Sequence, residues 1–88
     1  MSERIASMKI RLAPLEPISL AIVDESHKHA GHAGARDGGG HYLLNIVSAQ
    51  FAGKNTIARH RMIYSALGAM MRQEIHALTI KAQSPDEL

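Results

Sequence analysis

Apolar positions near the start of the chain follow two successive periods. The first set has helical spacing and consists of Ile5, Met8, Leu12 and Leu15. Ser2 is a suitable N-cap for this helix, and Pro14 and Pro17 predict its end because proline lacks the N–H that a helix interior needs. From residue 18 to residue 23 the period changes to two, which predicts a strand. The residues on one face of that strand are Ile18, Leu20 and Ile22.

A second strand and a helical region are predicted in the middle of the chain. The strand begins at His41 or Tyr42 and ends at Ser48. Beyond it, apolar residues follow the spacing of an amphipathic helix. These residues are Ile63, Ala66, Leu67, Met70 and Met71. Asn55 or Thr56 is suited to cap this region, which forms either two short helices or one bent helix.

A third strand is predicted after Ile75, where the period returns to two. The positions on one of its faces are His76, Leu78, Ile80 and Ala82. The helical region joins the second strand to the third, and parallel strands require such a crossover, which is right-handed as a rule. The first two strands can pair antiparallel. The predicted element order is therefore α-β-β-α-(α)-β.

This topology is expected to gather histidines at one edge of the sheet. Residues 26–40 contain five of the seven glycines and three of the six histidines, so they predict a long, flexible, irregular loop. Parallel strands begin at the same edge of a sheet, and the loop arrives where the second strand begins. We therefore expect His41 and His76 to lie beside the loop histidines. The loop histidines are His27, His29 and His32.

Composition restricts the chain to one small domain. Its 88 residues are expected to form a single domain, residues 1–88, with a short C-terminal tail at 84–88. The longest apolar run is too short to cross a bilayer, which needs about 20 residues, and no secretory signal is visible. The chain has no cysteine, so it has no thiolate ligand and no thiol nucleophile. We expect a cytoplasmic protein that does not enter a membrane.

The histidines are the first candidates for chemistry. Neutral imidazole binds zinc, copper, nickel and iron. The spacing of the loop histidines does not match a closed structural zinc site, which needs four ligands and often uses cysteine. Two interpretations of the loop therefore stay open, a ligand-bearing loop and a polar surface loop. His76 is either a fixed ligand on a rigid strand or a half-buried histidine bonded to the backbone.

The cationic residues near the predicted helix start suggest a second class of function. Arg59 and Arg61 either contact phosphate or lie on a solvated helical face, and His60 between them is expected to serve packing or capping. The net charge of +2 permits contact with nucleic acid but lacks the dense basic stripe that would demand it. An enzyme is not expected, since residues 24–27 are too close in sequence for a catalytic triad, whose members converge through tertiary structure.

Several motifs, in order along nearly the whole chain, resemble the BolA family. They are Asp24-Glu25-Ser26 followed by His29, Ser48-x-x-Phe51-x-Gly53-Lys54, Arg59-His60-Arg61-Met62-Ile63-Tyr64, His76-Ala77-Leu78 and Ser84-Pro85-x-Glu87. The segment His29 to Gly34 resembles the branch of the family with histidine, as opposed to cysteine, in this loop.

The resemblance implies an α+β fold of the class II KH-like type, with a three-stranded mixed sheet and its helices packed on one face. It also implies a non-enzymatic partner of monothiol glutaredoxins. The two proteins would share a [2Fe-2S] cluster, with the glutaredoxin cysteine and glutathione as ligands on the partner side, for cluster transfer or for iron and redox sensing. On this chain the resemblance implies His76 as one ligand and His29 as the second, with His32 and His27 as alternatives.

Some members of the family are described as transcriptional regulators that bind DNA through the helical region. In this chain the corresponding residues are Arg59, Arg61 and Lys54. DNA-binding regulation is thus the alternative function, and it does not exclude the first. A weak homodimer is a further alternative for the isolated chain.

Overall fold

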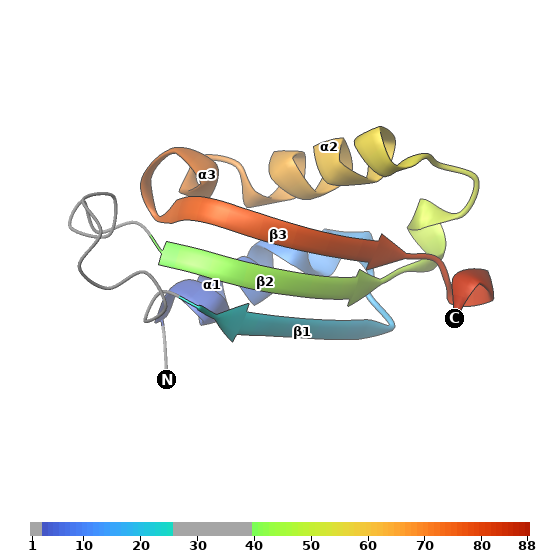
Figure 1. Ribbon diagram of the computed structural model, residues 1–88, viewed down its shortest axis with the longest axis horizontal. Coiled ribbons are helices and arrows are strands. Elements are labelled where there is room, and N and C mark those ends of the chain that lie inside the picture. Colours follow the sequence, from blue (N-terminus) through green and yellow to red (C-terminus); the bar gives the residue numbers. More distant parts are fainter. Residues whose placement is uncertain (1–2, 26–39) are drawn as a thin grey trace.

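The computed structural model describes residues 3–25 and 40–88. Its helices are α1 (Glu3–Leu12), α2 (Thr56–Leu67) and α3 (Met70–Gln73), and its strands are β1 (Ser19–Asp24), β2 (Gly40–Val47) and β3 (Ile75–Gln83). Three short 3-10 helices, η1 (Ala13–Leu15), η4 (Ala49–Phe51) and η5 (Pro85–Glu87), complete the described elements. The strands form one sheet in the order β1-β2-β3 (Figure 1).

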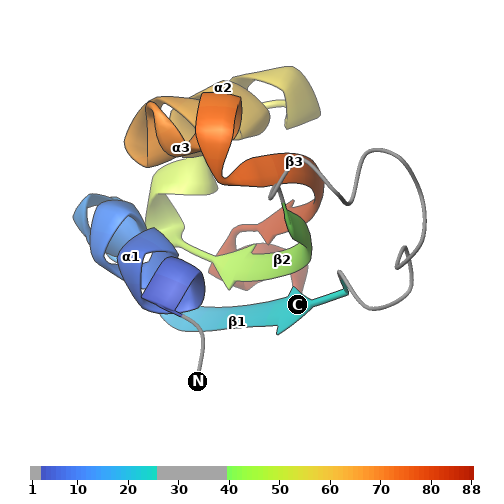
Figure 2. The same cartoon turned by 90° about the vertical axis from the view of Figure 1, so that its left-hand side faces the viewer.

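The sheet is mixed, as the sequence predicts. β1 pairs antiparallel with β2, and β2 pairs parallel with β3. α2 and α3 form the crossover between the two parallel strands, and the helices lie on one face of the sheet (Figure 2). This α+β architecture, with its three-stranded mixed sheet, confirms the fold class expected from the sequence.

β2 is the central strand, and its side chains divide cleanly between the two faces. Tyr42, Leu44 and Ile46 are buried under the helices, whereas the alternate residues are only partly buried. The helices fill the same core with Met8, Leu12, Ile63, Leu67 and Met70. The opposite face of the sheet carries no helix among the described residues. β2 is therefore fixed by hydrogen bonds on both edges and by the core on one face.

α1 follows the predicted apolar spacing. Met8 and Leu12 are fully buried, and Leu15 in η1 continues the same row. The helix gives way to η1 just before Pro14, and the chain then turns at Glu16, which has a left-handed φ of 51°. The predicted cap Ser2 lies outside the described residues.

The helical crossover consists of two helices, which decides between the two predicted alternatives. Asn55 caps α2, since its side chain accepts a hydrogen bond of 2.8 Å from the Ala58 N–H. α2 ends at Leu67, and Gly68 after it has a φ of 59°, which suits glycine. Arg11 of α1 supports this end by donating from Nη1 to the Leu67 carbonyl at 3.2 Å. A cation at a helix C-terminus is favourable for the helix dipole.

Two predicted strand positions are wrong. Ile18 was expected within the first strand, on the same face as Leu20 and Ile22, but it precedes β1 and is 65% exposed. Its N–H donates to the Val47 carbonyl at 2.7 Å, so the residue leads into the sheet without entering the core. His76 was expected on the same face as Leu78, and a register shift between β2 and β3 separates the two, as described below.

No helix within residues 3–25 and 40–88 combines the length and the apolar character needed to span a membrane.

The division of β2 into two faces predicts unequal effects of neighbouring substitutions. Leu44→Ala, which empties a fully buried position, should lower the free energy of unfolding by about 2–5 kcal/mol. Asn45→Ala on the opposite face of the same strand should lower it by less than roughly 1 kcal/mol. Urea denaturation followed by far-ultraviolet circular dichroism measures both values. Equal losses for the two variants would contradict the observed placement of the core.

Candidate metal centre

Two histidines meet where β2 and β3 begin. The two strands start at the same edge of the sheet, beside the end of β1 (Figure 1). The rings of His41 and His76 lie there with their centroids 5.0 Å apart and their planes inclined by 48°. The predicted approach of these two residues is therefore confirmed. His27, His29 and His32 lie outside the described residues, so their place beside this pair stays a prediction.

The backbone around His41 is held from both neighbouring strands. The Glu25 N–H donates to the His41 carbonyl at 2.7 Å, and the Gly40 N–H donates to the Glu74 carbonyl at 2.9 Å. The first bond ties β2 to the end of β1, and the second ties it to the residue before β3. His41 thus stands on a strand that is hydrogen-bonded on both sides, and a site on a regular element is held more precisely than a site on a loop.

A register shift determines the face of the sheet on which His76 lies. Gly40 pairs with Ile75, but His41 pairs with Ala77, so His76 is an extra residue on β3. Ile75 is buried, whereas His76 is exposed and in contact with the partly buried His41. Bulges of this kind redirect side chains near functional sites. The bulge therefore removes His76 from the inward row of Leu78 and explains why simple alternation misplaced it.

The described residues offer only part of a metal-ligand set. Within residues 3–25 and 40–88 no group of three or more histidine, cysteine or acidic side chains could hold a metal ion. The exposed imidazole of His76, with the His41 ring packed beside it, fits part of such a centre, because imidazole is a good ligand for iron and zinc. His41 was not among the candidate ligands in the sequence, although its position at a strand start did predict its approach to His76.

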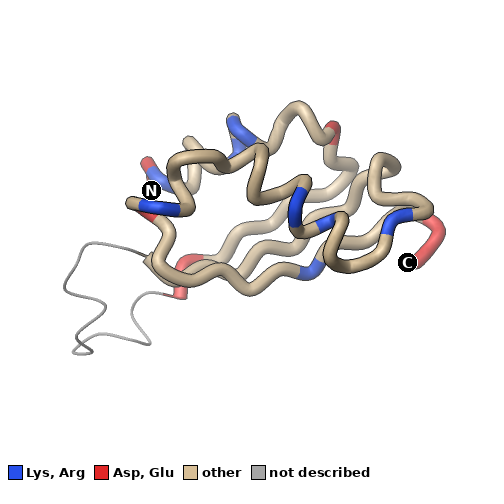
Figure 3. The backbone as a smooth tube through the Cα atoms, turned by 90° about the horizontal axis from the view of Figure 1, so that it is seen from above, with Lys and Arg blue, Asp and Glu red and all other residues tan. Residues whose placement is uncertain are grey.

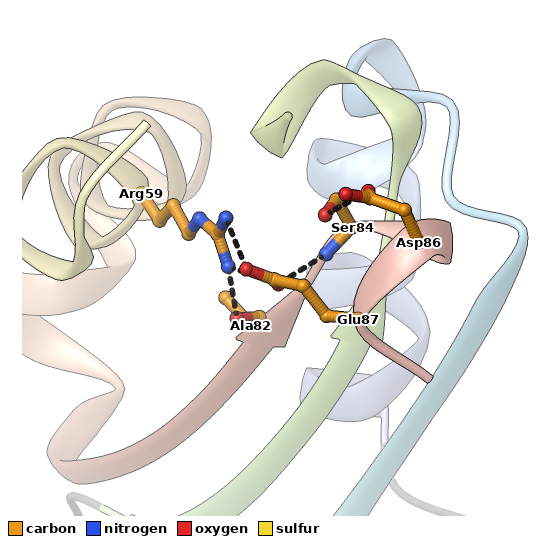
Figure 4. A network of polar contacts seen from close by, with 5 residues as sticks. All are labelled: Arg59, Ala82, Ser84, Asp86 and Glu87. Atoms are coloured by element: carbon orange, nitrogen blue, oxygen red, sulfur yellow. Dashed lines mark hydrogen bonds and ion pairs between the residues drawn. The ribbon is translucent and has the colours of Figure 1, made fainter. Parts of the chain in front are cut away.

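Arg59, a candidate for nucleic-acid contact, is engaged inside the fold (Figure 4). Its Nη1 donates to the Ala82 carbonyl at 3.0 Å and to Glu87 Oε1 at 2.6 Å, and its Nη2 donates to Glu87 Oε2 at 2.9 Å. The guanidinium also lies 6.0 Å from the centre of the Phe51 ring, and only 11% of the side chain is exposed. A contact between Arg59 and phosphate would have to compete with this bidentate ion pair.

Glu87 connects the end of the chain to the same network. Besides the two hydrogen bonds from Arg59, its carboxylate accepts a third from the Ser84 N–H at 2.8 Å, which completes a capping box around η5. The hydrogen bonds from Arg59 and from the Ser84 backbone lower the pKa of Glu87 to about 2. The same carboxylate raises the pKa of Arg59. The tail at 84–88 is thus folded onto α2 and β3.

The other two candidates for nucleic-acid contact are accessible to solvent. Lys54 and Arg61 are exposed, one just before α2 and the other on its outer side. In the part of the chain that the structure describes, lysine and arginine are spread over helices, connections and β3 and form no single dense stripe (Figure 3). His60, also on α2, contacts the Tyr64 ring at a centroid distance of 6.2 Å, in keeping with the packing role expected for it.

Comparison with known proteins assigns the family. A family model described as "BolA-like protein" matches residues 12–87. The chain belongs to the BolA family. The match covers the sheet, α2, α3 and the C-terminal network, and the BolA assignment inferred from the sequence motifs is confirmed.

Individual relatives agree with the BolA assignment. "Protein BOLA1, chloroplastic" of Arabidopsis thaliana is 38% identical over 91 residues, which cover 99% of this chain and 57% of the relative. "DNA-binding transcriptional regulator BolA" of Escherichia coli is 40% identical over 78 residues, which cover 89% of this chain and 70% of the relative. The solved structure of BolA1 from Arabidopsis thaliana has a TM-score of 0.84 at 37% identity, with 100% of this chain and 98% of that chain covered.

A BolA domain also occurs within longer proteins. "SufE-like protein 1, chloroplastic/mitochondrial" of Arabidopsis thaliana is 43% identical over 79 residues, which cover 84% of this chain but only 21% of the relative. The chain thus spans from a fifth to just over half of these two plant proteins. The BolA relatives are named as regulators or BolA-like proteins, not as enzymes, and the plant names place those proteins in organelles.

The ion pair of Glu87 predicts a loss of stability in acid. Because the pKa of Glu87 in the folded protein is about 2, below its ordinary 4.5, the ion pair stabilises the fold above that ordinary value and ceases to do so as the pH falls toward 2. Glu87→Gln should therefore lower the melting temperature at neutral pH and have little effect near pH 2. Melting curves of both proteins at a series of pH values measure this difference.

Glu3→Gln is the control, because Glu3 lies on α1 outside the network. A difference between wild type and Glu87→Gln that does not change with pH would contradict the role given to the ion pair.

Proposed function

We propose that this BolA-family protein binds a [2Fe-2S] cluster jointly with a monothiol glutaredoxin. The observation that carries the proposal is the approach of His41 and His76 at an open edge of the sheet, with ring centroids 5.0 Å apart. His76 is exposed there, so its imidazole is accessible to a metal centre held by another protein. In this function the chain is a binding partner and catalyses no reaction itself.

The ligand chemistry supports a shared centre over a closed one. Biological [2Fe-2S] clusters are held mainly by cysteine thiolates, and this chain has no cysteine. Its described residues also lack a set of three adjacent ligands. Any cluster bound here would therefore need thiolates from a partner, such as the glutaredoxin cysteine and its glutathione.

The chain's own contribution is histidine ligation. Histidine in place of thiolate raises the reduction potential of a [2Fe-2S] cluster and adds a group that can take up a proton. His76 is the proposed ligand at the start of β3, and His29 is the proposed second ligand, with His32 and His27 as alternatives. A cluster held between two proteins can be passed on or released more readily than one enclosed in a single chain, which suits transfer and sensing.

Substitution of His76 tests this proposal. The wild-type chain, mixed anaerobically with a monothiol glutaredoxin, glutathione, iron and sulfide, should give a visible circular dichroism spectrum distinct from that of the glutaredoxin alone. His76→Ala should abolish the distinct spectrum, since the ligand is lost. Separate His27→Ala, His29→Ala and His32→Ala variants should identify the second ligand, with His29→Ala the expected loss.

His60→Ala is the matched control, because His60 lies on α2 and contacts Tyr64. The proposal fails if the spectrum and the cluster lifetime are unchanged in His76→Ala and in all three loop variants.

DNA-binding regulation is a second candidate, supported by the name of the Escherichia coli relative and by the exposed cations Lys54 and Arg61. Binding through these residues should weaken steeply as salt rises, in proportion to the phosphates contacted. Lys54→Ala combined with Arg61→Ala should reduce both the affinity and the slope of this salt dependence, measured by fluorescence anisotropy with labelled duplex DNA.

Lys81→Ala, on β3 and outside the helical layer, is the control for charge alone. Binding that does not respond to salt, or equal effects of the control and the double variant, would count against this second function. Arg59 is left intact in the test, because its loss would also break the ion pair with Glu87.

A further inference from the structure

We infer that His41 is a positioning residue for His76: its ring fixes the direction of the His76 imidazole by packing and does not itself bind the cluster. The expected effect of His41 on cluster binding rests on the proposed shared-cluster function. Its structural part, the control of the His76 side chain, concerns the protein without metal.

The first step concerns the unequal support of the two histidines. His41 is on the central strand, partly buried, with hydrogen bonds to the end of β1 and beside the start of β3. His76 is exposed and is the second residue of the edge strand β3, which begins shortly after the short helix α3. Left alone, an exposed side chain samples several rotamers. His41 is therefore the fixed member of the pair and His76 the member that needs fixing.

The second step concerns the bulge. Since His41 pairs with Ala77 and Gly40 with Ile75, His76 has no Cα partner on β2. The bulge places His76 on the face of the sheet that carries His41, but it does not select one rotamer of an exposed side chain. The described contact that restrains the His76 ring is its packing on His41 at 5.0 Å with an inclination of 48°. This geometry falls within the range of favourable offset or tilted ring pairs.

The third step separates positioning from ligation. Packing requires a ring at position 41 but no nitrogen, whereas ligation requires the nitrogen. His41→Phe keeps a ring and removes both nitrogens, and His41→Ala removes the ring as well. Asn45→Ala is the matched control, because Asn45 lies on the same strand and the same face but pairs with Lys81, away from His76.

The first measurement uses the metal-free chain. The side-chain couplings and ring-proton shifts of His76, recorded by nuclear magnetic resonance, should indicate one dominant χ1 rotamer in wild type, His41→Phe and Asn45→Ala. In His41→Ala they should show averaging over rotamers. An unchanged His76 rotamer in His41→Ala, with the fold intact by far-ultraviolet circular dichroism, overturns the inference.

The second measurement adds each chain to a monothiol glutaredoxin that carries a [2Fe-2S] cluster, and follows the visible circular dichroism spectrum. The apparent dissociation constant should rise by about 10- to 100-fold in His41→Ala, the usual loss when a residue that orients a ligand is removed. It should stay within about two-fold of wild type in His41→Phe and Asn45→Ala. An equal loss in His41→Phe and His41→Ala overturns the inference, because His41 would then be a ligand.

The two measurements also separate this inference from the proposed function. A wild-type chain that leaves the spectrum of the glutaredoxin unchanged refutes the shared cluster. The rotamer of His76 in the metal-free variants then still decides whether His41 positions it.

Discussion

β3 can lie parallel to β2 only if the chain returns to the edge where β2 began. α2 and α3 make this return, and their apolar residues cover the inner face of the sheet on the way. The parallel pairing therefore brings together two strand starts that are more than thirty residues apart in sequence. His41 and His76 are adjacent for this reason, and the bulge on β3 then places the second histidine on the face of the sheet that carries the first.

The opposite ends of β2 and β3 serve stability. There Arg59 joins α2 to the Ala82 carbonyl and to Glu87, and η5 folds back over the end of β3 (Figure 4). Ser84, fully buried, anchors the same turn. One end of the sheet is thus closed by a polar network, while the exposed His76 stands at the other. The residues that hold the fold together are largely separate from those that offer ligands.

Periodicity and connection length were sufficient to predict the element order, the mixed sheet and the approach of His41 to His76. Three features were not predicted, because each depends on residues that are distant in sequence. The bulge at His76 follows from the pairing register of two strands, not from either strand alone. The engagement of Arg59 depends on Glu87, which is 28 residues away. Ile18 has the right period for a strand but lies before the point where β1 enters the sheet.

The exposure of His76 and the lack of cysteine have a common consequence. A buried histidine could complete only a centre enclosed by this chain, and the chain has no thiolate with which to enclose a cluster. An exposed histidine at the start of an edge strand is instead accessible to ligands from a second protein. Such a side chain loses rotamer freedom when it binds, and a neighbouring ring that already restrains it reduces that loss. Under the proposed function, the His41 ring on β2 therefore restrains the His76 ligand of this chain, and the thiolate ligands come from the partner.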